Sequence, residues 1–190
     1  MTLHVENTLI PEVKIITPKK FGDTRGFFSE SWNKQKMNEA GFNYDFVQDN
    51  HSLSKNKNTI RGLHFQLPPF AQTKLIRCGS GAMFDVAVDF RIGSPTFGKW
   101  VGCELSFENG KQLLIPEGFL HGFITRVPNT EIIYKCTNYY AENFEGSVRF
   151  DDPLLNINWG LKGSPSLSKK DEEAPYLAGV SSPFVWKKEI

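Results

Sequence analysis

The sequence predicts an all-β sandwich or barrel, and two observations carry that prediction. In residues 83–90, MFDVAVDF, large apolar side chains occupy every second position, a period that places them on one face of a strand. Elsewhere, short apolar runs alternate with the turn sequences GSPTFG, ENG, PEG and VPNT, a rhythm typical of sandwiches and barrels. At 190 residues, a single domain spanning residues 1–190 is expected.

The N-terminal quarter predicts two short strands and a helix. Strands are expected at residues 13–16 and at residues 27–29, where FGDTRGFFSE supplies a glycine-bounded turn. The single strong helix signal follows. Asn33 can cap its start, Met37 contributes to a modest apolar stripe, and Gly41 suits the left-handed position after its end.

The rest of the chain predicts mainly strands. They are expected at residues 46–50, 59–66, 73–78, 83–90, 100–105, 112–115, 121–125 and 131–139. Residues 52–58, SLSKNKN, read as a polar loop. The tail from Asp151 onward is rich in Pro, Gly and Ser, with one helical turn at residues 168–173. Its apolar end, FVW at residues 184–186, is expected to pack back on the body.

Charge and cysteine content narrow the classes of function. Lys and Arg number 22 against 21 for Asp and Glu, so no overall basic excess favours nucleic acid or an acidic membrane. Cys78, Cys103 and Cys136 lack the Cys-x-x-Cys spacing of zinc or redox sites and are expected to be buried and reduced. Neither a signal peptide nor an apolar stretch of membrane-spanning length is evident. A cytoplasmic protein is therefore expected.

The strand TIRGLHFQ, residues 59–66, carries an unusual density of polar chemistry. Arg61, His64 and Gln66 interrupt its apolar positions. A lone histidine in a strand is more often a satisfied structural residue than a catalytic one. Arg61 and His64 lie three residues apart, so a regular strand would turn them to opposite faces. A bulge at Gly62 would allow both to point inward.

Three further polar residues lie among strand-like apolar sequence. They are Lys74, His121 in IPEGFLHGF and Tyr134 in IIYKCT. Tyr134 shares its strand face with Ile132 and is therefore expected to point into the barrel, although an interior tyrosine is often only a hydrogen-bonded core residue. Asp85 is expected at the cavity wall, where a structural hydrogen-bonding role is equally open.

A metal site is difficult to assemble from these residues. The spacing of Pro116, Gly118 and His121 resembles the second motif of cupins, which often supplies a histidine ligand. The first cupin motif needs a His-x-His pair with a nearby Glu, whereas the sequence around His64 reads LHFQ. No metal is therefore expected.

Several long motifs, in order, resemble one enzyme family. FGDTRGFFSESWN, FVQDNHSLS, IRGLHFQ, FDVAVDFRIGSPTFGKWVG, LLIPEGFLHGF, YKCTNYY, FDDP and LSKKD are similar to motifs of the dTDP-4-dehydrorhamnose 3,5-epimerases. The resemblance covers roughly residues 10–171. It implies a cupin-like jelly-roll barrel with one short N-terminal helix and a short C-terminal helical segment. It also implies a homodimer that needs no metal or organic cofactor and acts on a nucleotide-linked 4-keto-6-deoxy sugar.

The same resemblance implies roles for individual residues. His64 matches the family's catalytic base, Asp171 the carboxylate that supports it, and Tyr134 the proton donor. Positions that match the family's substrate contacts are Arg25, Glu30, Gln48, Asn50, Arg61, Lys74, His121, Tyr139, Glu145 and Lys170. Of these, Arg25 is expected to reach the neighbouring subunit's site, and Tyr139 to stack on the nucleotide base.

The implied activity inverts C3 and C5 of dTDP-4-dehydro-6-deoxyglucose to give dTDP-4-dehydro-L-rhamnose, a precursor for cell-surface polysaccharide. Relatives that invert only C3 share the same His, Asp and Tyr, so that narrower activity stays open. A metal-dependent cupin and a non-catalytic sugar-nucleotide-binding module are alternatives from other classes. The loop SKNKNT is longer than in the shortest family members, and the stretch after Glu173 matches no family motif; both leave the choice of sugar undecided.

Overall fold

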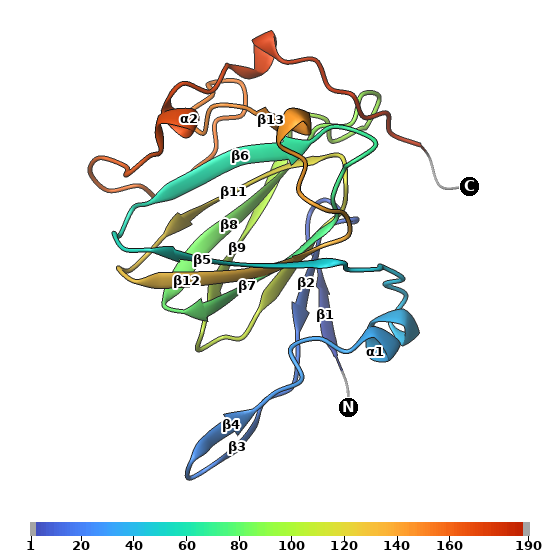
Figure 1. Cartoon of the computed structure of the whole chain (residues 1–190), viewed down its shortest axis with the longest axis vertical. Coiled ribbons are helices and arrows are strands. Elements are labelled where there is room, and N and C mark those ends of the chain that lie inside the picture. Colours follow the sequence, from blue (N-terminus) through green and yellow to red (C-terminus); the bar gives the residue numbers. More distant parts are fainter. Residues whose placement is uncertain (1–2, 188–190) are drawn as a thin grey trace.

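The computed structural model describes residues 3–187 as two packed antiparallel sheets (Figure 1). The six-stranded sheet is ordered β1 (His4–Asn7), β2 (Lys14–Thr17), β10 (Gln112–Ile115), β7 (Lys74–Ser80), β12 (Thr130–Cys136) and β5 (Gln48–Ser54). The five-stranded sheet is ordered β13 (Glu145–Ser147), β6 (Ile60–Gln66), β11 (Phe119–Thr125), β8 (Ala82–Asp89) and β9 (Trp100–Ser106). Together they form the predicted cupin-like jelly-roll barrel.

The space between the sheets holds the first of two large apolar cores. Alternate residues of β8 divide between the cores: Met83 and Ala87 face the inner core, whereas Val86 and Val88 face an outer one. The outer core lies under the C-terminal segment, which passes over the five-stranded sheet (Figure 1). Strand β8 is thus covered on both faces, which explains why its sequence is apolar almost throughout.

Both predicted helical segments form short helices, and the first has the predicted caps. The Asn33 side chain accepts a hydrogen bond from the Lys36 amide at the start of α1 (Lys34–Glu39), and Gly41 after its end has a φ of +89°. Ser168 caps α2 (Lys169–Glu172). Short 3₁₀ turns follow at η1 (Glu142–Phe144) and η2 (Leu177–Gly179). Within residues 3–187, no helix combines the length and apolar character needed to span a bilayer.

The strand boundaries differ from expectation at β5 and β12. Strand β5 continues to Ser54, so the predicted loop at residues 52–58 begins only after it. Its register with β12 covers seven residue pairs, and this pairing overrides the polar character of an edge strand. Strand β12 ends at Cys136 instead of residue 139. Strands β1 and β13 were not predicted, because four and three residues carry too little periodicity.

A two-stranded hairpin projects from the body of the molecule (Figure 1). It consists of β3 (Phe21–Asp23) and β4 (Gly26–Phe28), whose register pairs Phe21 with Phe28. All six of its residues are exposed. Lys20 fastens the base of the hairpin by donating to the carbonyl oxygens of Phe107 and Glu108.

Candidate active site

A bulge in β6 places Arg61 and His64 on the same face. Their partners on β11 are Phe123 and His121, so three steps along β6 correspond to two along β11. Phe123 belongs to the inner core, and residues two apart on a strand share a face. Both Arg61 and His64 therefore point into the barrel. The sequence had shown only that a bulge at Gly62 would allow this.

Gly62 makes this bulge possible. Its φ is +117°, and a Cβ atom there would lie 2.6 Å from both the Cα of Gly122 and the carbonyl oxygen of His121. Only glycine combines that backbone conformation with so close an approach. The neighbouring strand thus selects glycine, and glycine in turn sets the direction of His64.

His64 is paired with Asp171, which α2 supplies from the far end of the sequence. The His64 Nε2 atom lies 2.6 Å from Oδ1 of Asp171. The same oxygen accepts a hydrogen bond from the Gly62 amide at 3.2 Å, and Ser168 Oγ donates to Oδ2 at 2.7 Å. Because Asp171 engages Nε2, the Nδ1 atom is the ring nitrogen left to accept a proton.

Asp171 is almost fully buried, yet it is held as a carboxylate. Burial by itself raises the pKa of this carboxyl group. The hydrogen bonds with His64 and Ser168, the charge of His64 and the Gly62 amide outweigh that effect and lower the pKa below its usual value. A charged carboxylate fixes the tautomer of His64 and favours its protonated form once a proton has been taken up.

Tyr134 reaches the cavity from the opposite sheet. On β12 it is paired with Asn50 of β5 and Ile76 of β7, and its ring packs against the inner core. Burial raises the pKa of its hydroxyl group, and the charge of Arg61 only partly offsets this rise. Tyr134 therefore keeps its proton at neutral pH and can donate it.

Asn50 and Gln48 line the same side of the barrel as Tyr134. Gln48 Nε2 donates to Asn50 Oδ1 at 3.0 Å, and Asn50 Nδ2 lies 3.7 Å from the Cys136 sulfur. Gln48 also accepts the Tyr140 amide at 2.9 Å. These bonds hold both amide side chains in fixed orientations along β5.

A second histidine–aspartate pair lies beside the first. His121 is directly opposite His64 in the register of β6 and β11, and its Nε2 lies 2.7 Å from Asp85 Oδ1. Asp85 is fully buried, and its Oδ2 atom has no hydrogen-bond partner. A buried carboxylate that accepts so few bonds relies on nearby positive charge for its stability.

Lys74 provides positive charge in this region, at the start of β7. Burial lowers the pKa of its ammonium group, while the charges of Cys136, Asp85 and Glu145 act in the opposite direction. Lys74 and His121 also line one small cavity together. The cavity thus offers a cationic donor beside His121.

The rim of the barrel carries three more predicted residues. Glu145 on β13 and Lys170 on α2 form an ion pair. Tyr139 is 63% exposed. Gln66 ties the Tyr139 backbone to the barrel, because its Nε2 donates to the Tyr139 carbonyl oxygen at 3.1 Å. An exposed aromatic ring fixed at its backbone is suited to stacking against a flat ligand.

Arg25 and Glu30 are not brought to this cluster within one chain. Arg25 lies between β3 and β4, in the hairpin that projects from the body (Figure 1). Its guanidinium group pairs with Asp23. Glu30 pairs with Lys36 beside α1. The remaining predicted site residues come from β5, β6, β7, β11, β12, β13, α2 and the segment after β12.

Ser168 and Gly62 were not among the predicted site residues, whereas Asp85 was expected at the cavity wall and is buried there beside His121. Ser168 carries a readable signal, since a serine three residues before an aspartate is typical of a helix start. The Gly62 amide contact gives no sequence signal, because it depends on the bulge. In the described part of the chain, no three His, Cys, Asp or Glu side chains are grouped as metal ligands.

Comparison with known proteins places this geometry in a family. The sequence profile of the dTDP-4-dehydrorhamnose 3,5-epimerases matches residues 7–179. The Salmonella typhimurium protein named dTDP-4-dehydrorhamnose 3,5-epimerase is 55% identical over 174 residues, which cover 91% of this chain and 94% of that protein.

Solved structures agree with the sequence comparison. The Legionella pneumophila dTDP-6-deoxy-D-glucose-3,5-epimerase, crystallised with dTDP-4-keto-L-rhamnose, superposes with a TM-score of 0.94 at 44% identity, covering 98% of this chain and 100% of that one. A Streptomyces bikiniensis 3'-monoepimerase in complex with dTDP-quinovose has a TM-score of 0.85 at 33% identity, covering 90% of this chain and 87% of that one. This chain belongs to the dTDP-4-dehydrorhamnose 3,5-epimerase family.

Proposed function

We propose that the chain is an isomerase that inverts C3 and C5 of dTDP-4-dehydro-6-deoxyglucose, giving dTDP-4-dehydro-L-rhamnose. One observation carries the proposal: His64 and Tyr134 enter the barrel from opposite sheets. A sugar ring held between them presents one face to the imidazole and the other to the phenol. Inversion requires this arrangement, because the proton must leave from one face and return to the other.

His64 is the proposed base. The C4 ketone acidifies the protons on C3 and C5, and Nδ1 of His64 takes one of them while Asp171 stabilises the imidazolium that forms. The electron pair of the broken C–H bond moves into an enolate whose oxygen is O4. Lys74 and Arg61 supply the positive charge that stabilises this oxygen.

Tyr134 is the proposed acid. Its hydroxyl group gives a proton to the enolate carbon from the opposite face. Before the next inversion the resulting phenolate recovers a proton from solvent and the His64 imidazolium releases one to solvent. The electron count of the substrate does not change, so the reaction as written needs no redox cofactor, and Lys74 and Arg61 supply the positive charge at O4. Inversion at both carbons by one site requires that C3 and C5 be brought in turn between His64 and Tyr134.

The nucleotide is assigned to the rim. Lys170 is a proposed nucleotide contact, and Tyr139 is proposed to stack on the thymine ring. Glu145, His121, Gln48 and Asn50 are proposed substrate contacts. Arg25 and Glu30 are proposed to act in a homodimer, each reaching the partner's site. The exposed hairpin supports this arrangement, since Phe28 is 62% exposed within one chain.

The setting of the reaction is also proposed. Residues 1–190 act as one domain, in the cytoplasm, in a route to cell-surface polysaccharide. The three cysteines, which are free and buried, fit a reducing compartment. The partners in this account are the nucleotide sugar and a second copy of the chain, without nucleic acid or membrane.

Inversion at C3 alone is the second candidate. The similarity to the 3'-monoepimerase supports it, because that protein has the same fold and comparable overall length. Both candidates use the same base and acid, and they differ only in which carbon is presented to them.

Single substitutions test the roles of base and acid. His64→Ala should abolish solvent proton exchange at the substrate carbons while substrate still binds. Tyr134→Phe should retain more exchange than net inversion, because the enolate still forms and can be reprotonated on its original face. Deuterium incorporation measured by NMR beside a binding titration separates these outcomes. Near-normal exchange in His64→Ala would contradict the assignment of the base.

A further inference from the structure

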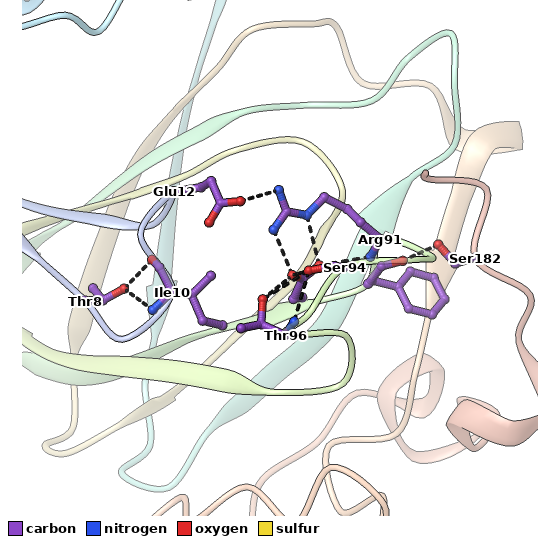
Figure 2. Close-up of polar contacts among 9 residues, drawn as sticks. Thr8, Ile10, Glu12, Arg91, Ser94, Thr96 and Ser182 are labelled. Atoms are coloured by element: carbon purple, nitrogen blue, oxygen red, sulfur yellow. Dashed lines mark hydrogen bonds and ion pairs between the residues drawn. The ribbon is translucent and has the colours of Figure 1, made fainter. Parts of the chain in front are cut away.

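The last eight described residues, 180–187, follow the end of the family match at residue 179. They are fastened to the segment after β8 by backbone hydrogen bonds. The Ile92 amide donates to the Phe184 carbonyl oxygen, and the Trp186 amide donates to the Ile92 carbonyl oxygen, both at 2.9 Å. Ser182 Oγ also donates to the carbonyl oxygen of Phe90 (Figure 2). The tail is therefore joined to the barrel as a short parallel bridge.

The segment that receives the tail is itself held firmly. Asp89 is fully buried and accepts hydrogen bonds from Arg91 NH2 at 2.7 Å, Ser94 Oγ at 2.5 Å and Thr96 Oγ1 at 2.6 Å. Arg91 Nη1 additionally donates to Glu12 at 2.9 Å, and Figure 2 shows this pair. Ile92 follows this network directly, so the tail docks on a fixed anchor.

The bridge turns Phe184 inward and leaves Val185 in solvent. The Phe184 ring packs against Phe65 with centroids 6.1 Å apart, whereas Val185 is 67% exposed. Phe184 also lines a cavity of about 10 Å³ together with Lys74 and His121, space for about one water molecule. This cavity lies where β6 and β10 end and β7 and β11 begin, at one end of the barrel.

We propose that Phe184 is a positioning residue that seals this end of the barrel and excludes water from Lys74 and His121. The inference rests on the proposed function, in which Lys74 stabilises the enolate oxygen. Electrostatic stabilisation of that oxygen is stronger in a site from which water is excluded. The tail, which no family motif predicted, thereby contributes to the environment of the reacting carbonyl group.

The pH at which Lys74 ionises is expected to show whether Phe184 keeps water away from it. Burial lowers the pKa of its ammonium group, and water admitted by loss of the Phe184 ring would reduce that effect. The charged or titratable groups around Lys74 are Asp85, Glu145, Lys170, Cys136 and His121. None of them is altered by substitution of Phe184.

The test compares Phe184→Ala with Val185→Ala, its neighbour on the exposed side of the same bridge. Competitive acetylation of the intact protein with acetic anhydride, read at Lys74 by peptide mass spectrometry across a pH series, gives the midpoint of ionisation without requiring catalysis. The midpoint should move to higher pH in Phe184→Ala only. Phe184→Leu, which keeps an apolar plug, should restore the wild-type midpoint.

Activity adds a second readout. The alkaline decline of kcat should move to higher pH in Phe184→Ala while kcat at neutral pH falls and KM changes little. An unchanged Lys74 midpoint in folded Phe184→Ala would overturn the seal, even with reduced activity; if that variant does not fold, Phe184→Val decides by the same criterion. An inactive wild-type enzyme with a shifted midpoint in the variant would contradict the proposed function instead.

Discussion

At the scale of single residues, the proposed role of His64 as base depends on its pairing with Asp171. The carboxylate accepts three hydrogen bonds in a nearly closed environment, so its charge is directed at one ring nitrogen. An amide at residue 171 would fill the same space while losing the charge and offering the wrong donor pattern. The histidine would stay in place with its tautomer unspecified and without a carboxylate to stabilise the imidazolium.

Asp171→Asn should therefore lower kcat by about 10²- to 10⁴-fold, the range in which positioning of a catalytic histidine contributes. KM should change much less, because the carboxylate is aimed at His64 and not at the solvent side of the cavity. Steady-state kinetics of the variant measure this. Asp45→Asn, an exposed aspartate paired with Lys34, is a matched control, and equal losses in both variants would contradict the assigned role.

At the scale of elements, the contact between β6 and β11 determines which way Arg61 and the proposed base His64 point. Period-two patterning predicted β8, and cap residues predicted α1, because these signals are local. The shared face of Arg61 and His64 was not predictable, since strand parity alone separates them and the bulge depends on the approach of Gly122 from β11. The helical turn that contains Asp171 was likewise predictable from neighbouring residues. Its pairing with His64 was not, because the two residues lie far apart in the sequence.

Gly62→Ala tests this element directly. A Cβ atom 2.6 Å from two backbone atoms, at a positive φ, should cost about 3 kcal/mol of unfolding free energy. The added atom should also push β6 away from β11 and so displace His64. The folded variant should therefore lose activity as well as stability. Chemical denaturation and initial rates measure both quantities. Gly179→Ala, where a Cβ would meet open space, should leave both unchanged, and a Gly62→Ala variant with normal kinetics would count against the bulge as the determinant of geometry.

At the scale of the whole molecule, the Asp89 network connects distant parts of the chain. Glu12 near the N-terminus, the end of β8, the loop at residues 94–96 and the tail all meet there (Figure 2). Burial raises the pKa of Asp89, but bonds from Arg91, Ser94 and Thr96 lower it overall. With a folded-state pKa below the unfolded one, the stabilisation is present at neutral pH and is lost as the pH falls through the folded-state value.

Asp89→Asn should remove about 3 kcal/mol of unfolding free energy at neutral pH, because it leaves the Arg91 charge without its buried partner. The difference from wild type should begin to shrink below about pH 4, where the carboxyl group of the unfolded chain becomes protonated, and should vanish below the lower folded-state pKa of Asp89. Urea denaturation across a pH series measures it. Asp151→Asn, in a more exposed pair with Arg149, should cost less than about 1 kcal/mol, and a pH-independent loss in Asp89→Asn would contradict the linkage.

The measurement that tests the central claim most directly is the location of solvent deuterium in the product. The wild-type protein would be incubated with dTDP-4-dehydro-6-deoxyglucose in deuterated water, and the ring carbons examined by NMR and mass spectrometry. The account predicts label at both C3 and C5, with inverted configuration at each. Label at C3 alone would redirect the assignment to a 3-epimerase, and absence of label beside an active relative in parallel would contradict the proposed substrate and mechanism.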